Sequence, residues 1–201
     1  WARRSEWEAT GNRPNDPLRF VITGNAGTGK TTAAKILGRL LHALGLLPSA
    51  KVVVASAPSL IGEHVGATKA RTNAAIQDAL GGVLFIDEAH QLGDGYGLEA
   101  IQALVPAMLN SRERLTIILA GHPKCMHTLF TSDEWLSRRF PETLRVNFPD
   151  YDDVQLWEIL QRKLRSQQWT LDPAAEQPLR AVLQTRMRLP GFGNAGGVEN
   201  L

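Results

Sequence analysis

A glycine-rich octapeptide, GNAGTGKT at residues 24–31, limits the folds open to this chain more than any other feature. It matches the pattern G-x-x-x-x-G-K-[ST] in full and follows an apolar run that ends at Thr23. In this pattern a strand passes through a flexible loop into a helix, so that backbone N–H groups and the helix dipole converge on a phosphate. The sequence therefore predicts a phosphate-binding loop.

A second apolar run, VLFIDE at residues 83–88, ends in two adjacent carboxylates. Asp87 suits the shell of a Mg²⁺ ion, and Glu88 can orient and polarise an attacking water. At the end of the next apolar run, His122 is expected beside Glu88, either helping to place that water or as an ordinary loop histidine. Together the two motifs predict a site for ATP and Mg²⁺.

The side chains around this site receive separate roles. Lys30 is expected to reach the β- and γ-phosphates, and the Thr31 hydroxyl is expected to bind Mg²⁺ together with Asp87. The predicted nucleotide contacts are Gly24, Asn25, Ala26, Gly27, Thr28, Gly29, Lys30, Thr31, Thr32 and Asp87. Residues 87–90 also spell DEAH, a helicase signature, but the chain ends in helical patterns instead of the second sheet domain those helicases need. We interpret that match as coincidence.

Apolar runs alternate with helical patterns up to Phe148. The strand-like runs are 18–23, 51–56, 82–87, 115–120 and 144–148, and the helical patterns lie near 30–45, 67–80, 97–110 and 132–138. Such alternation is typical of a mostly parallel sheet between helices. Beyond it the period becomes helical. Asp150 is the expected N-cap of a first helix, Asp172-Pro173 is expected to start a second, and Gly191–Gly197 is expected to lead into a third.

These patterns predict an α/β domain with a five-stranded parallel sheet over residues 18–148. An N-terminal arm is expected over 1–17, and a small all-helical lid, truncated at its C-terminus, over 149–201. We expect the chain to be a segment of a longer protein.

Composition adds only broad limits. Hydrophobic residues make up 43% and charged residues 21%, with a net charge of +2, which gives no argument for nucleic acid or a membrane surface. No run approaches the roughly 20 apolar residues of a membrane span. The single cysteine, Cys125, excludes an internal disulfide and is interpreted as an ordinary thiol. A cytoplasmic location is expected.

Several blocks together resemble the CbbX-like (CfxQ) family of AAA+ ATPases. The family includes red-type rubisco activases, the EccA ATPases of type VII secretion and stage V sporulation protein K. The blocks cover residues 20–35, 59–92, 97–109, 116–126, 137–151 and 191–201, in family order and spacing. The resemblance implies an AAA+ core followed by a helical lid, and ATP hydrolysis.

The resemblance also implies contacts between subunits. Arg139 occupies the arginine of the family's S-R-F-P element and would act as an arginine finger in the ATP site of a neighbouring subunit, with Arg138 as the alternative assignment. A finger supplied in trans implies a ring, usually of six subunits. His64 falls in a loop that faces the central pore, where the family has an aromatic residue that grips a polypeptide.

Two further implications concern the nucleotide. The arm at 1–17 matches the stretch where the family places adenine contacts. Gly196 stands where the lid motif G-N-A-R has its arginine, and Glu199 where a second basic residue is usual. Because glycine has no side-chain donor, we expect ATP to bind well and to be hydrolysed slowly, unless another residue supplies the charge.

Three functions follow. The leading one is a ring ATPase, homo-oligomeric or formed with neighbouring AAA+ domains, that remodels or threads a protein substrate. The alternative is a nucleotide-dependent assembly module with little turnover inside a larger protein with several AAA+ units. A DNA-acting AAA+ ATPase is the third and is disfavoured, because the charge is nearly balanced and no DNA-binding motif is appended.

Overall fold

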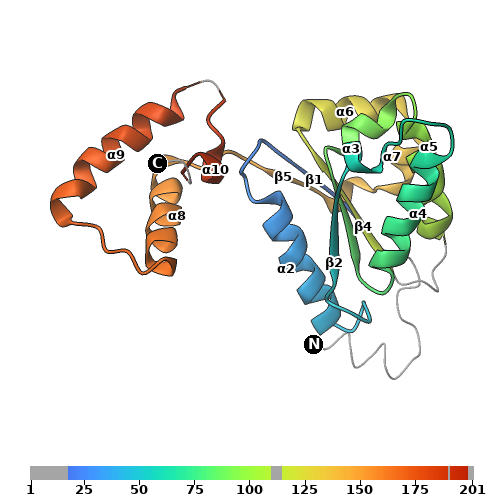
Figure 1. The fold of residues 1–201 in the computed structure, drawn as a ribbon, viewed down its shortest axis with the longest axis horizontal. Helices are drawn as coiled ribbons and strands as arrows, with labels where there is room; N and C mark the ends of the chain where they lie inside the picture. The colour runs from blue at the N-terminus through green and yellow to red at the C-terminus, as the bar shows by residue number, and fades with distance from the viewer. Residues whose placement is uncertain (1–17, 110–114, 190, 199–201) are drawn as a thin grey trace. The chain divides into compact units, whose positions relative to one another are not determined.

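The computed structural model describes residues 18–109, 115–189 and 191–198, which belong to two compact units (Figure 1). The first unit contains the described residues of 1–23 and 30–147. The second contains 24–29 and the described residues of 148–201. The phosphate loop is thus grouped with the helical unit by its contacts, although in sequence it lies between two elements of the sheet unit. The predicted arm at 1–17 lies outside the described residues.

The sheet has five strands in the order β2-β3-β4-β1-β5. The strands are β1 (Arg19–Gly24), β2 (Val52–Ser56), β3 (Val83–Asp87), β4 (Thr116–Gly121) and β5 (Arg145–Phe148). The pairs β2·β3, β3·β4 and β1·β4 are parallel. All residues of the central strand β4 are buried, whereas Val54 on the edge strand β2 is 49% exposed. The predicted fold is confirmed, and β4 separates the strand before the phosphate loop from the strand that ends at Asp87.

Helices cover both faces of this sheet. They are α2 (Lys30–Ala43), α3 (Ala57–Leu60), α4 (Ala67–Ala79), α5 (Gly97–Leu109), α6 (Pro123–Ser132) and α7 (Glu134–Arg139), with 3-10 turns η1 (Ala89–Gly93) and η3 (Glu142–Leu144). The sequence analysis did not predict α3, α6 or the 3-10 turns. No helix in the described part of the chain is both long and apolar enough to cross a membrane.

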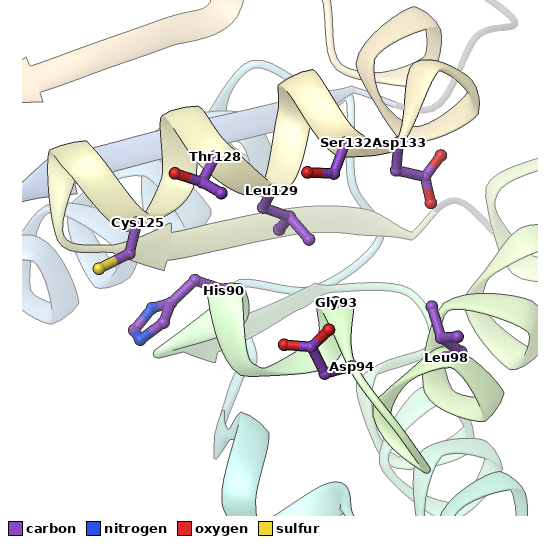
Figure 2. A pocket seen from close by; sticks show the side chains of 9 residues that line it. All are labelled: His90, Gly93, Asp94, Leu98, Cys125, Thr128, Leu129, Ser132 and Asp133. Atoms are coloured by element: carbon purple, nitrogen blue, oxygen red, sulfur yellow. The ribbon is translucent and has the colours of Figure 1, made fainter.

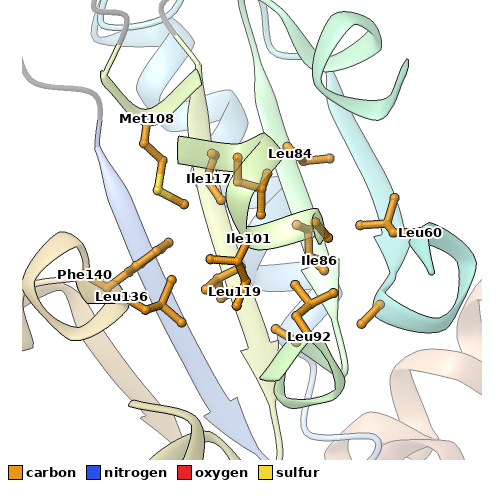
Figure 3. Close-up of a cluster of buried hydrophobic side chains, with 14 of the residues drawn as sticks. Leu60, Leu84, Ile86, Leu92, Ile101, Met108, Ile117, Leu119, Leu136 and Phe140 are labelled. Carbon is orange, nitrogen blue, oxygen red and sulfur yellow. The ribbon is translucent and has the colours of Figure 1, made fainter. Parts of the chain in front are cut away.

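Alternation along the strands decides which helices pack on which face. Leu84 and Ile86 of β3 point into a core shared with the helices α4 to α7 (Figure 3). Val83 points the other way, where the absent side chain of Gly38 lets α2 approach β2 and β3 closely. Figure 3 also shows Leu136 and Phe140, from the chain around α7, reaching into the same core. The helices α2 and α7 therefore lie on opposite faces of the sheet (Figure 1).

The second unit contains α8 (Asp153–Ser166), α9 (Pro173–Met187) and α10 (Asn194–Val198). Its small core is formed by Leu156, Trp157, Leu160, Leu183 and Val198. The helix α9 starts at Asp172-Pro173 as predicted, and Asp172 caps it by accepting the backbone N–H of Ala174. The predicted cap of α8 was wrong: Asp152, not Asp150, caps this helix. Asp152 forms a capping box, which leaves the Asp150 carboxylate available for other contacts.

Candidate nucleotide site

The phosphate loop is held by its carbonyl groups. Three consecutive carbonyl oxygens accept hydrogen bonds from the helical unit: Ala26 from Asn194 Nδ2 at 3.0 Å, Gly27 from the Ala195 N–H at 3.2 Å and Thr28 from the Tyr151 hydroxyl at 3.1 Å. In a planar trans peptide the next N–H points opposite to the carbonyl. The N–H groups of residues 27–29 are therefore directed away from these partners, in the arrangement that an anionic phosphate requires.

Glycines make this loop conformation accessible. Gly27 has φ +71° and Gly29 has φ +90°, both in the left-handed region. A Cβ atom at Gly27 would also overlap the carbonyl oxygen of Gly193. Any other residue at position 27 would therefore be strained in its backbone and would displace the loop that contacts it.

A polar network centred on Asp150 fixes the same loop. Both carboxylate oxygens of Asp150 accept from Asn25 Nδ2 at 2.9 Å. Asn194 Nδ2 donates to Asp150 Oδ1 at 3.0 Å, and Asn194 Oδ1 accepts from the Tyr151 N–H at 3.1 Å. Asn194 is only 4% exposed and has φ +49°, a conformation that asparagine tolerates better than most residues. The sequence analysis missed these supporting roles of Asp150, Tyr151 and Asn194.

Asn194→Ala is expected to weaken ATP binding roughly ten-fold. The change removes the side chain that holds the loop, and the net loss of about one buried hydrogen bond corresponds to this factor. A fluorescent ATP analogue in an equilibrium titration measures the change. Asn194→Gly is the matched control, since it removes the same side chain but keeps the left-handed backbone unstrained. If both variants bind ATP as tightly as the unmodified chain, the network does not shape the site.

The amino end of α2, the helix that follows the loop, has an electrostatic field that favours an anion. Lys30 and Thr31 open α2 and are partly buried, while Thr32 is exposed. The first turn of α2 contains no acidic residue, so its positive dipole end is not neutralised from within the turn. Thr31 supplies a hydroxyl oxygen and Asp87 carboxylate oxygens, the donor type that Mg²⁺ prefers.

The two carboxylates lie at the carboxyl end of β3. One oxygen of Asp87 accepts the Glu88 N–H at 2.9 Å, and one oxygen of Glu88 accepts from Gln91 Nε2 at 3.3 Å. Glu88 is exposed and has φ +53°, a left-handed conformation that a non-glycine residue adopts at a cost. The backbone thus turns sharply at Glu88, and its side chain leaves the strand in a different direction from that of Asp87.

The neighbouring strand β4 carries His122 to the same edge of the sheet. Gly121 is level with Thr23 of β1, and Leu119 is level with Ile86 of β3. His122 follows directly as the N-cap position of α6 and is exposed. Its participation in placing a water molecule stays a prediction.

A cavity of about 360 Å³ lies beside this edge, between η1 and α6 (Figure 2). It is lined by His90, Gly93, Asp94, Leu98, Cys125, Thr128, Leu129, Ser132 and Asp133. The lining contains two carboxylates and no lysine or arginine, which disfavours the phosphates of a nucleotide. Cys125 is exposed here.

The predicted arginine finger lies far from Lys30 and Thr31, which open α2 in the same unit. Arg139 ends α7, and its carbonyl oxygen accepts from Arg19 at the start of β1, at 3.3 Å. Thr23 lies about 13 Å further along the same strand. Because α7 and α2 also lie on opposite sheet faces (Figure 1), Arg139 at the end of α7 is remote from the start of α2 in its own subunit.

The remaining predicted positions are on the surface. His64 is exposed, and its neighbour Val65 is 83% exposed, in the turn before α4. Gly66 closes this turn with φ +82° and donates its N–H to Glu99 at 3.1 Å. Gly196 is exposed in α10, with nothing within 4 Å of where a Cβ would stand. Glu199 lies outside the described residues.

Comparison with protein families decides the class. Residues 20–147 match the model of the ATPase family associated with various cellular activities (AAA). The chain belongs to the AAA family. Residues 152–201 match a second model, the AAA lid domain. Membership of the AAA family confirms the expected enzyme class, that of an ATPase.

Individual relatives confirm the predicted resemblance to CbbX and CfxQ proteins. Protein CbbX of Cereibacter sphaeroides is 39% identical over 91% of this AAA chain and 60% of its own length. A chloroplastic ribulose bisphosphate carboxylase/oxygenase activase of Cyanidioschyzon merolae is 38% identical over 92% of the chain and 64% of its length. Protein CfxQ of Xanthobacter flavus is 36% identical over 91% and 59%. The chain thus spans about three fifths of these relatives.

Solved structures agree on the fold. The FIGL-1 AAA domain in complex with ADP aligns with a TM-score of 0.54 and 25% identity, over 75% of this chain and 49% of that one. The replication initiator DnaA, bound to AMPPCP and single-stranded DNA, aligns with a TM-score of 0.59 and 22% identity, over 99% and 58%. At this identity the second likeness concerns the fold alone.

Proposed function

We propose that this AAA chain binds and hydrolyses Mg²⁺-ATP in an oligomeric ring and uses the cycle to remodel or thread a protein substrate. The observation that carries the proposal is the phosphate loop, whose carbonyls at 26–28 are engaged so that the N–H groups of residues 27–29 point away from these contacts. Lys30 and Thr31 follow at once in the first turn of α2.

The roles of the chain's own residues follow from their positions. Lys30 and the loop amides bind the phosphates, while Thr31 and Asp87 hold Mg²⁺, which neutralises charge on the phosphate oxygens. Glu88 orients the attacking water and polarises it. The strained backbone at Glu88 supports this role, because such strain is kept where surrounding structure fixes a side chain for a task.

The position of Arg139 supports a ring. Its backbone lies near the amino end of β1 and on the sheet face opposite α2, so its side chain serves a phosphate only on another subunit. A head-to-tail contact that repeats and closes generates a ring. The similarity to CbbX and to a rubisco activase supports a protein as substrate. The exposed pair His64 and Val65 would grip it.

An ATP-dependent assembly module with little turnover is the second candidate, and Gly196 favours it. A permanently unfolded polypeptide distinguishes the two in a steady-state ATPase assay. A remodelling motor hydrolyses ATP faster when the polypeptide is added, since engagement of the substrate is coupled to turnover. A slow rate that does not respond to the polypeptide, with ATP still required for assembly, would favour the module.

Gly196→Arg is expected to raise the rate of ATP hydrolysis roughly ten-fold. The added guanidinium would donate about one charged hydrogen bond to the transition state, and its free energy corresponds to this factor. The position accepts a side chain, because it is exposed and open around the Cβ. Gly196→Ala controls for the gain in helix propensity without a charge. An unchanged or lower rate in Gly196→Arg, with ATP binding intact, would contradict the view that a missing arginine slows this chain.

A further inference from the structure

The turn at the end of α7, which carries Arg139, is held by an arginine from each of two strands. Arg19 of β1 donates from Nη1 to the carbonyl oxygen of Arg139 at 3.3 Å and from Nη2 to that of Met108 at 2.6 Å. Met108 lies near the end of α5. Arg19 therefore links the carboxyl ends of the helices α5 and α7 to the amino end of β1.

Arg145 of β5 holds the same turn from another direction. Its Nε and Nη2 donate to the carbonyl oxygen of Phe140 at 3.1 and 2.8 Å. Nη2 also lies 3.3 Å from both the carbonyl oxygen and the hydroxyl of Ser137. The last carbonyls of a helix lack partners within the helix, and a planar guanidinium can satisfy several of them at once. The two arginines thus contact carbonyl groups before, at and after Arg139.

Aromatic packing fixes the Arg145 guanidinium itself. Its carbon lies 4.5 Å from the centre of the Phe130 ring, a distance suited to a cation–π contact. The Phe130 ring packs at 5.9 Å, tilted by 59°, against Phe140, which is fully buried. The turn and the arginine that clamps it thus share one apolar support.

The neighbouring Arg138 has an exposed side chain, in contrast to the buried support of Arg145. Arg138 pairs with Glu134 at 2.5 Å, but the two side chains are 74% and 80% exposed. Exposed pairs of this kind contribute little to holding a conformation. The carbonyl contacts from Arg19 and Arg145 therefore restrain the backbone that carries Arg139 more than this exposed pair does.

We propose that Arg19 and Arg145 are positioning residues for the arginine finger, fixing the backbone from which Arg139 projects toward a neighbouring subunit's ATP. This inference rests on the proposed function, in which Arg139 acts in trans. Such a group must be held to within a fraction of an ångström, and a displacement of about 1 Å costs roughly 100-fold in rate.

The first arm of the test uses Arg145→Met, which keeps the apolar contact with Phe130 and removes the donors. It is expected to lower kcat roughly 10- to 100-fold and to change the ATP KM less than about two-fold, because each subunit's own phosphate loop is intact. Arg145→Lys keeps the positive charge but not the planar, forked guanidinium. Its kcat is expected to lie between that of the unmodified chain and that of Arg145→Met. Arg162→Met removes an exposed arginine paired with Glu158 and is the control.

The second arm mixes subunits. Arg145→Met subunits have an intact site but a displaced finger, whereas Glu88→Gln subunits have an intact finger but an inactive site. Random mixing places an intact finger against an intact site at about one interface in four. ATP hydrolysis in the mixture is therefore expected to rise well above that of either variant alone. Arg139→Ala mixed with Glu88→Gln serves as the reference pair.

The outcomes separate the two proposals. Recovery in both mixtures supports the positioning role of Arg145. Recovery with Arg139→Ala but not with Arg145→Met would overturn it, since the defect would then lie in the variant's own site or fold. Recovery in neither mixture would overturn the trans-acting finger, and with it the inference built on it.

Discussion

Glu88→Gln is expected to abolish ATP turnover while ATP binding stays intact. The carboxylate is the group placed to polarise the attacking water, and removing such a group costs roughly 10²- to 10⁴-fold. Glutamine retains an oxygen that can accept from Gln91, as Glu88 does at 3.3 Å, so the local geometry is preserved. Single-turnover hydrolysis and an equilibrium titration with an ATP analogue measure the two properties separately.

Asp78→Asn is the matched control for this change, because Asp78 is exposed near the end of α4, which precedes the amino end of β3, whereas Glu88 follows its carboxyl end. Turnover close to that of the unmodified chain is expected. If Glu88→Gln hydrolyses ATP at an undiminished rate, the water is activated by another group, and His122 at the end of β4 would be the next residue to replace.

Arg139→Ala is expected to lower kcat about 10³-fold or more, with the affinity for ATP nearly unchanged. An arginine that enters a neighbouring site stabilises charge only in the transition state, and such fingers contribute 10³ to 10⁵ in rate. Its own subunit keeps the whole phosphate loop, which explains why binding persists.

Arg138→Ala decides between the two adjacent assignments. The Arg138 side chain is occupied in an exposed pair with Glu134, so its replacement is expected to have a small effect. A large loss in Arg138→Ala with normal turnover in Arg139→Ala would move the role by one residue. Normal turnover in both would remove the argument for a shared site.

Local signals sufficed for the phosphate loop and the central strands. The octapeptide pattern itself requires a strand before it and a helix after it. The apolar runs that end at Asp87 and Gly121 form β3 and β4, which are buried on both faces. The helix α6 was missed although its signals were present: Pro123 opens it, and Met126, Leu129 and Phe130 are buried at helical spacing.

Other features depend on contacts that no local pattern contains. Asp150 meets Asn25 across 125 positions, and Arg19 meets Arg139 across 120. Asp150 was predicted to cap a helix, since an aspartate before an amphipathic run usually does so. Only the fold reveals that Asp152 takes this role and that Asp150 supports the phosphate loop.

The central claim, a ring ATPase with sites shared between subunits, is tested most directly by the rate of ATP hydrolysis per subunit as a function of protein concentration. The account predicts a rate that rises with concentration to a plateau as subunits assemble, and that collapses at every concentration in Arg139→Ala. A rate per subunit that is independent of concentration and insensitive to Arg139→Ala would contradict it, because each subunit would then complete its own site.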